Sequence, residues 1–390
     1  MKRTFCVAAL VACLPHLVHA QSSVTLAGII DVGINNVTNA GGAHQYMMSS
    51  GVNNGSRVIF RGIEDLGGGL KSLFFLENGF NVNNGTIGQG GLLFGRQAYV
   101  GLSSSRLGSL TLGRQYDSIV DYVGQVTAAD NWGGYISAHP GDLDNFNNSY
   151  RANNSIKYTS PTLAGFTFGG VYSLGGVAGD VSRNPVWSVG AGFARGPFSL
   201  GVAMLSARNP NLSFFGNNSQ TALTATTANG TVTPVYSGFM SAHSYTSIGA
   251  ATGYTFSRST VSVSYSNVRF SDMGDTSSGP NPAQYRGTAS FNNAEIGYRF
   301  RPTEAWLLGA AYDFTDGNGA GGNGGARYHQ GEMSVQYFLS KRTTVYVIGV
   351  YQHASGVDST GKAAVAAINL LTPSKSDSQA VVRVGLRHKF

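Results

Sequence analysis

The sequence predicts an all-β fold: a 16-stranded antiparallel transmembrane β-barrel with one long loop folded into its interior. Three observations predict it. After residue 20 there is no run of about 18 apolar residues, so no transmembrane helix is available. Apolar and polar residues alternate with strand period from one end of the chain to the other. The connections alternate between short turns and long loops, as they do when the two rims of a barrel face different compartments.

The first 20 residues predict a cleaved signal peptide. Lys2 and Arg3 form a charged start, residues 5–14 are apolar, and residues 18–20 form a small-residue cleavage site before Gln21. The mature chain, residues 21–390, is therefore expected to be exported as one barrel domain. Because only closed sheets and helices satisfy all backbone polar groups in lipid, an exported chain without apolar helices is either soluble all-β or an outer-membrane barrel.

The composition excludes several other classes of protein. Both cysteines lie in the predicted signal peptide, so the mature chain has no disulfide and no thiolate metal site. Charged residues make up 12% of the chain, against roughly 25% in an average soluble domain, while it contains 54 glycines, 21 phenylalanines and 19 tyrosines. The net charge of +7 falls to +5 once Lys2 and Arg3 are removed, and no Lys/Arg run exceeds two residues. No nucleic-acid partner is predicted.

The strands follow from the alternation of apolar and polar side chains. In residues 24–35, for example, Val24, Leu26 and Ile30 alternate with Thr25 and Asp31. The sixteen predicted strands cover residues 24–36, 56–65, 70–82, 93–104, 109–116, 151–160, 165–173, 184–194, 197–207, 244–256, 259–269, 292–301, 304–315, 326–338, 343–353 and 378–390.

The connections alternate strictly in length. Short turns are expected at residues 66–69, 105–108, 161–164, 195–196, 257–258, 302–303 and 339–342. The other connections are longer and rich in Asn, Gly and Ser, and the loops at 208–243 and 354–377 are expected to be solvated external loops. Strict alternation over fifteen connections favours a barrel over a sandwich or a propeller.

The last strand predicts one face toward lipid and one toward water. Val382, Val384, Leu386 and Phe390 alternate with residues that include Arg383 and Arg387. A chain that ends on an aromatic residue at the edge of its final strand resembles the assembly signal of outer-membrane proteins. The penultimate Lys389 resembles the variant of that signal found in β-proteobacteria.

One long segment does not alternate. Residues 116–150 carry five acids and no Lys or Arg, whereas residues 57–114 carry six bases and three acids. A structureless loop of this length in a compact domain indicates either a function or an error in the assignment of strands. We expect it to fold into the bore, with its acids facing bases on the wall. Arg57 and Arg61 share one face of their strand, and because an Arg on lipid costs roughly 2–4 kcal/mol, both are expected to point inward.

Five segments in order carry a family resemblance: QSSVTLAGIIDVGI, SRVIFRGIEDLGGGLKSLFFLENGF, FGRQAYVGLSSSRLGSLTLGRQYD, RANNSIKYTSP and the terminal HKF. From Gln21 to Phe390 the chain resembles the general trimeric porins of Gram-negative outer membranes, in the β-proteobacterial branch. The resemblance implies a homotrimer of 16-stranded barrels in outer-membrane lipid, in which the third long loop narrows the pore.

The resemblance also implies where the constriction lies. The basic wall cluster of the family falls on Arg57, Arg96 and Arg151, and the loop positions fall on Asp121 and on residues near the loop tip. The predicted site comprises Arg57, Arg61, Arg96, Arg114 and Arg151 on the wall, and Asp117, Asp121, Thr127, Asp130 and Asn131 on the loop. Thr127 and Asn131 stand where several porins of this fold carry acids, which favours anions. Opposed charges at a narrow point select ions by close-range electrostatics.

The predicted function is general diffusion of small hydrophilic solutes and inorganic ions. No enzyme is predicted, because there is no GxSxG motif and the histidines fall mostly in predicted loops. No cofactor or metal is expected: a calcium loop starting at Asp316 would need Glu where Arg327 stands. Each arginine could instead pair with the nearest acid only to stabilise the wall. The alternative functions are a surface adhesin or receptor barrel, and a substrate-specific channel, hinted at by the loop aromatics Tyr116, Tyr122, Trp132 and Tyr135.

Overall fold

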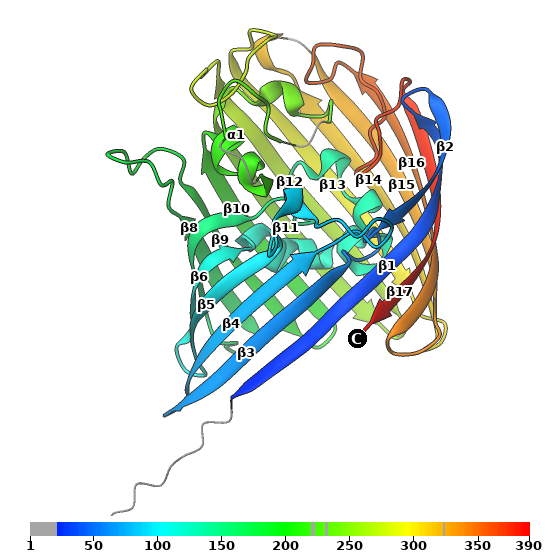
Figure 1. The fold of residues 1–390 in the computed structure, drawn as a ribbon. Helices are drawn as coiled ribbons and strands as arrows, with labels where there is room; N and C mark the ends of the chain where they lie inside the picture. Colours follow the sequence, from blue (N-terminus) through cyan, green and yellow to red (C-terminus); the bar gives the residue numbers. More distant parts are fainter. Residues whose placement is uncertain (1–21, 220–222, 231–232, 323) are drawn as a thin grey trace, which may run out of the picture.

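The computed structural model describes residues 22–219, 223–230, 233–322 and 324–390, and these form one closed antiparallel sheet (Figure 1). The predicted signal peptide, residues 1–20, lies outside the described residues. The strands are β1 (Ser23–Ala40), β2 (Ala43–Ser50), β3 (Arg57–Gly67), β4 (Leu70–Gly79), β5 (Gln97–Ser104), β6 (Gly108–Gln115), β7 (Ala152–Thr159), β8 (Phe166–Ser173), β9 (Val186–Arg195), β10 (Phe198–Arg208), β11 (Ala242–Phe256), β12 (Ser259–Met273), β13 (Gly287–Phe300), β14 (Trp306–Asn318), β15 (Gly324–Phe338), β16 (Thr343–Gly356) and β17 (Ser378–Lys389).

The seventeen strand segments occupy sixteen positions around the barrel, so the predicted fold is confirmed. β2 pairs with residues 32–40 of β1, and β3 pairs with residues 23–29 of the same strand, so β2 and β3 share one position. β2 was not predicted. Its signal is the pair Gly41–Gly42, which has φ values of 63° and 100° and makes the tight turn between β1 and β2.

The seven predicted short turns all connect neighbouring strands at one end of the barrel. The helical segments are short: α1 (Pro210–Ser213), η1 (Gln89–Gly91), η2 (Ile119–Val123), η3 (Gly124–Val126), η4 (Ala129–Gly133), η5 (Tyr135–Ser137), η6 (Pro140–Asp142), η7 (Phe215–Asn218), η8 (Ser237–Phe239) and η9 (Ala320–Gly322). Within the described ranges, no helix has the length and apolar character needed to cross a membrane.

The two faces of the wall differ as the alternation predicts. On β17, Val382, Val384 and Leu386 are exposed on the outside, and Arg383 between them is fully buried inside. An apolar outer face of this kind suits lipid, since no charge has to leave water.

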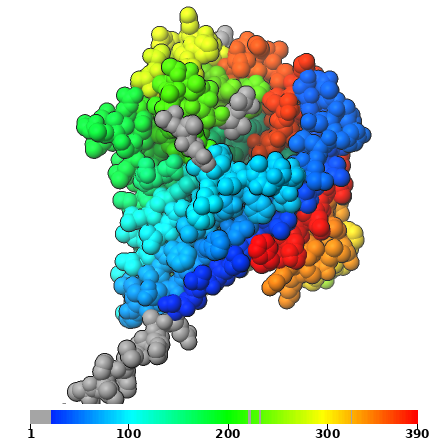
Figure 2. All heavy atoms as spheres, viewed as in Figure 1, coloured from blue at the N-terminus to red at the C-terminus, as the bar shows by residue number. Residues whose placement is uncertain are grey.

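The first and last strands, β1 and β17, lie side by side in the wall and close the barrel (Figure 2). The terminal Phe390 exchanges backbone hydrogen bonds with Gly28 of β1, at 3.0 and 3.1 Å. Its ring occupies the space where a Cβ on residue 28 would stand, 2.3 Å from Cζ of Phe390. Glycine at position 28 therefore lets the terminal aromatic residue seat against the first strand.

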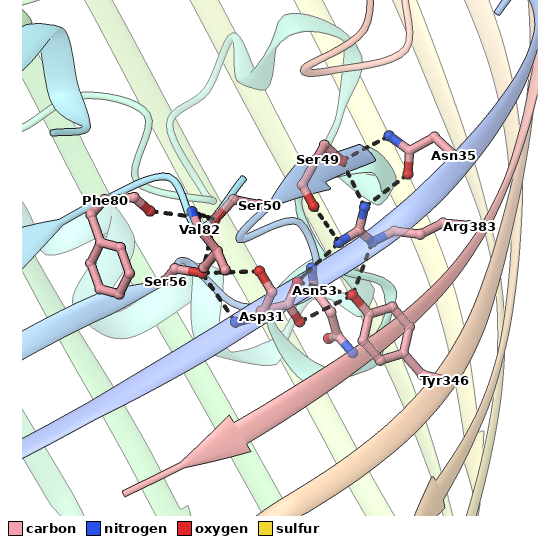
Figure 3. A network of polar contacts seen from close by, with 10 residues as sticks. All are labelled: Asp31, Asn35, Ser49, Ser50, Asn53, Ser56, Phe80, Val82, Tyr346 and Arg383. Carbon is pink, nitrogen blue, oxygen red and sulfur yellow. Dashed lines mark hydrogen bonds and ion pairs between the residues drawn. The ribbon is translucent and has the colours of Figure 1, made fainter. Parts of the chain in front are cut away.

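A buried ion pair spans the closure on the lumen side (Figure 3). Arg383 of β17 lies 3.1 Å from Asp31 of β1, and both side chains are fully buried. The Arg383 guanidinium also donates to Asn35 at 2.8 Å and to the hydroxyl of Tyr346 at 2.9 Å, and Tyr346 donates to Asp31 at 2.9 Å. Charge-assisted hydrogen bonds thus link β1, β16 and β17.

Two loops expected to be solvated instead fold into the mouth of the barrel. The connection between β10 and β11 packs Phe214 and Phe215 against other buried aromatic rings, with centroid separations of 4.9–6.0 Å. The aromatic residues of this cluster include Phe146, Tyr150, Phe214, Phe215, Tyr236, Tyr245 and Phe270. The connection before β17 buries Ile368, and Asn369 Nδ2 donates to the carbonyl of Tyr135 at 2.9 Å. The expectation of solvated loops was wrong because the apolar side chains that they bury, aromatic in the first loop and aliphatic in the second, outweigh their polar average composition.

Candidate functional site

The loop between β6 and β7, residues 116–151, lies inside the barrel (Figure 1). Asp117 holds its two ends together: Oδ1 accepts from the Ile119 amide at 2.8 Å, and Oδ2 accepts from Asn145 Nδ2 at 2.7 Å. Asp142 accepts from the backbone amides of Asn147 and Ser149, both at 3.0 Å. These carboxylates therefore organise the loop backbone, as acids that cap turns do.

Glycines on the wall let the loop approach closely. A Cβ at Gly201 of β10 would lie 1.8 Å from the backbone oxygen of Tyr122. A Cβ at Gly309 of β14 would lie 2.3 Å from the ring of Trp132. Tyr122 and Trp132 thus serve to seat the loop on the wall, and they do not form a ladder of free aromatic faces along the pore.

We expect Gly201→Val to displace the loop toward the lumen and lower single-channel conductance. The added side chain overlaps the Tyr122 carbonyl, and overpacking of this kind costs about 1–3 kcal/mol. Planar-bilayer recordings measure the conductance. The control is Gly331→Val in β15, where a Cβ would meet no atom within 4 Å. Equal conductance of the two variants would show that close approach at Gly201 does not set the loop position.

Three predicted bases lie together where the loop meets β3, β5 and β7. Arg57 and Arg96 share one carboxylate, Glu77 of β4, whose Oε1 lies 3.3 Å from Arg57 Nε and 2.9 Å from Arg96 Nε. Arg96 also donates to the hydroxyl of Tyr116 at 2.8 Å, and the Arg151 guanidinium lies over the Tyr116 ring at 5.5 Å. Among the described ion pairs, Glu77 is the one acid that pairs with this cluster, and it pairs with two of the three guanidinium groups, so the cluster keeps a net positive charge.

The positive charge of this cluster affects the hydroxyl of Tyr135 in the loop. Burial raises the pKa of its hydroxyl, but the fields of Arg96, Arg57 and Arg151 outweigh burial and lower the pKa below its usual value. A phenol whose ionised form is favoured reports a positive local potential. The sequence analysis did not select Glu77, although alternation along residues 70–82 places it on the same face of its strand as Lys71, which was a usable signal.

The two remaining predicted bases differ in their surroundings. Arg114 of β6 donates to the carbonyls of Gly95 at 2.8 Å and Asn217 at 2.7 Å, and to Asn218 Oδ1 at 2.7 Å. Because two of these acceptors belong to the β10–β11 connection, Arg114 ties that connection to the wall. The three acceptors are neutral. Arg61 is solvent-exposed on the lumen face of β3.

Of the loop acids, Asp130 is the one that remains exposed to solvent. Asp117, Asp142 and Asp144 are fully buried. Asp121 forms an ion pair with Lys157 of β7, a base that the sequence analysis did not select. Its position within the lumen raises the pKa of Asp130 above its usual value, and the charges of Arg57 and Arg96 offset only part of this rise.

The loop tip contacts the opposite wall. Thr127 is buried, and its hydroxyl donates to the Gly124 carbonyl at 2.8 Å. Asn131 donates to the Thr127 carbonyl at 2.8 Å and accepts from Arg299 Nη1 of β13 at 3.1 Å. Arg299 is a further base at the narrowing that sequence reasoning missed, because the pairing depends on how far the loop reaches across the barrel.

A closed antiparallel barrel with an apolar outer face and a basic narrowing formed by an inward loop defines a membrane channel of the porin class. The family model described as Gram-negative porin matches residues 6–356, and the chain belongs to this family, which places it in the outer membrane.

Similar proteins agree with this assignment. An outer membrane porin protein of Bordetella pertussis is 41% identical over 205 residues, which are 49% of this chain and 52% of that protein. Outer membrane porin protein 32 of Delftia acidovorans is 35% identical over 40% of this chain and 45% of that protein. The matched segments span about half the length of these relatives. Among solved structures, the anion-selective porin from Comamonas acidovorans superimposes with a TM-score of 0.71 at 22% identity, covering 95% of this chain and all of the other.

Proposed function

We propose that residues 21–390, released from the signal peptide, form a general diffusion porin that passes small hydrophilic solutes and inorganic ions down their gradients and prefers anions. The observation that carries the anion preference is the sharing of the single carboxylate of Glu77 by Arg57 and Arg96, with Arg151 beside them. An excess of fixed positive charge at a narrow point raises the local anion concentration.

The negative charge on the loop and the positive charges on the wall also produce a field across the narrowing, perpendicular to the pore axis. Asp130 is exposed on the loop, and the charges of Arg57 and Arg96 on the wall act on its carboxylate. The resulting transverse field aligns solutes that have a dipole or separated charges. A bulky apolar solute gains no partner there and must displace ordered water.

The assembly is proposed to be a homotrimer in outer-membrane lipid. Support comes from the outer membrane protein OmpT of Vibrio cholerae, solved in a trimer form, which shares the fold with a TM-score of 0.66. The likeness to the anion-selective porin from Comamonas acidovorans supports the anion preference in the same way. The packing of Tyr122 and Trp132 against wall glycines argues against the substrate-specific alternative.

Planar-bilayer recording of the mature protein tests the proposal. We expect stepwise ohmic conductance and, under a KCl gradient, a reversal potential of anionic sign. Liposomes that hold the protein should also swell in neutral sugars of small size. Folded, heat-modifiable protein that yields no conductance would remove the porin function and leave a surface-binding barrel. A cationic reversal potential would retain the channel and reject the anion preference.

A further inference from the structure

A second cluster of ionisable groups lies behind the inward loop, on the side away from the arginines. It consists of His139 of the loop, Glu295 of β13 and Asp313 of β14, which are 2%, 3% and 1% exposed. One donor atom from each lies within 4.8 Å of the donor atoms of the other two. The sequence analysis predicted no metal, since these residues are up to 174 positions apart and follow no metal-binding spacing.

The cluster contains more negative charge than its protein partners offset. Asp144 and Glu332 adjoin it: Asp144 lies 2.6 Å from His139 Nδ1, and Gln330 Nε2 bridges Asp313 and Glu332 at 3.1 and 2.8 Å. Across the described part of the chain, no Lys or Arg forms an ion pair with any of these four carboxylates. Buried carboxylates without cations are costly, so either protons or a bound cation must offset them.

Two buried atoms of the kind that bind metals face each other, and neither has a hydrogen-bond partner among the described residues. They are Nε2 of His139 and Oδ1 of Asp313. They lie 3.8 Å apart, which is too long for a hydrogen bond and less than the sum, about 4.2 Å, of two bonds to a zinc ion. An imidazolium proton would bring one charge to four carboxylates and leave this separation unbridged.

The other ring nitrogen is held as it is in metal-binding histidines. Nδ1 of His139 donates to Asp144 Oδ2 at 2.6 Å, and the same oxygen accepts a hydrogen bond from the hydroxyl of Ser266 at 2.7 Å. A carboxylate on Nδ1 fixes the ring and directs Nε2 toward the metal in carboxylate–histidine–zinc arrangements. The carboxylate of Glu295 is also held in place, because its Oε1 accepts a hydrogen bond from the Ala128 amide at 2.9 Å.

We propose that His139, Glu295 and Asp313 bind a divalent transition-metal ion of the Zn²⁺ class, with Asp144 as the positioning residue of the histidine. One nitrogen and two carboxylate oxygens are a donor set that zinc accepts, and they leave a fourth position for water. Zinc would place these atoms about 3.3–3.5 Å apart, so the loop side closes slightly on binding. The ion would fasten the inward loop to β13 and β14 and so fix the width of the pore.

Metal counting on the folded porin tests the site. Mature protein in detergent is stripped with a chelator and dialysed against ZnCl₂, and bound zinc is measured by elemental analysis. We expect the wild type to bind one zinc per chain. His139→Asn and Asp313→Asn should each lower the zinc affinity at least about a hundredfold, so that no zinc is counted. Asp144→Asn should lower the affinity about 10- to 100-fold. Zinc is also expected to raise the thermal midpoint of the wild type and leave that of Asp313→Asn unchanged.

The matched control is His243→Asn. His243 also pairs through Nδ1 with an aspartate, Asp275 at 2.9 Å, but its side chain is 39% exposed and is not part of a carboxylate cluster. This variant should keep the full zinc count. Equal loss in both histidine variants, or no loss in either, overturns the proposal.

A spectrum of the wild type decides the matter if the variants misfold. Co²⁺ in place of Zn²⁺ should give the intense visible absorption of a four-coordinate site, and the weak spectrum of six-coordinate Co²⁺ alone would contradict it. None of these readouts depends on conductance, so failure of the metal site leaves the channel proposal untouched.

Discussion

Replacing Arg57 and Arg151 together with glutamine is expected to abolish most of the anion preference of the channel. Arg57 is partly exposed at the narrowing and Arg151 is buried beside it. A unit charge about 4 Å from an ion is worth roughly 1 kcal/mol in water, which is about a fivefold change in ion occupancy. Arg96 remains but is bound directly to Glu77. The ratio of anion to cation permeability, obtained from the reversal potential, should therefore fall at least about fivefold.

The control carries the same change in net charge away from the constriction. Arg106 and Arg195 are exposed at the short-turn end of the barrel, and Arg106→Gln with Arg195→Gln should leave the reversal potential close to that of the wild type. If both double variants shift equally, selectivity reflects the overall charge of the protein. Unchanged selectivity in the Arg57/Arg151 variant would assign those arginines to wall stability alone.

Replacing Arg383 with methionine is expected to destabilise the barrel by about 3–5 kcal/mol, because it leaves the Asp31 carboxylate buried without its cation. The same change removes the donor to Asn35 and the link to Tyr346 across the closure of the barrel. Urea unfolding of the protein in lipid vesicles measures the loss.

The comparison variant is Arg387→Met, at a nearby inward position further along β17. Arg387 is only partly buried and donates one long hydrogen bond, 3.4 Å, to Thr344. The Arg387→Met substitution should lower the free energy of unfolding by less than about 1 kcal/mol, as the loss of a surface interaction does. The double variant Asp31→Asn with Arg383→Met should recover part of the loss, since no unpaired charge is then buried. Equal destabilisation by Arg383→Met and Arg387→Met would assign the effect to lost side-chain packing.

The wall of this protein could be predicted closely because strand periodicity is a local property. Alternation along residues 378–390 was enough to place Val382 on the lipid side and Arg383 on the lumen side. β2 escaped prediction because it shares a barrel position with β3, which is visible only when both pair with β1.

The loops show the limit of that reasoning. Their composition indicated solvation, yet Phe214 and Phe215 are buried in the barrel mouth by rings from β11 and β12. Of the acids expected to face the arginines, Asp117 and Asp142 bind the amides of their own loop. Composition states how polar a segment is on average and not which of its side chains finds a partner.

The sequence by itself determined the barrel and the two faces of strands such as residues 378–390, because these depend on neighbours a few residues apart, and the family resemblance indicated where the basic wall lies. The tertiary structure alone decided which charges meet. Asp31 and Arg383 are 352 residues apart, and His139 reaches Glu295 and Asp313 only after the barrel has closed and the loop has folded inward. Such contacts depend on strand register and on the path of the loop through the lumen, and no local pattern of residues encodes either.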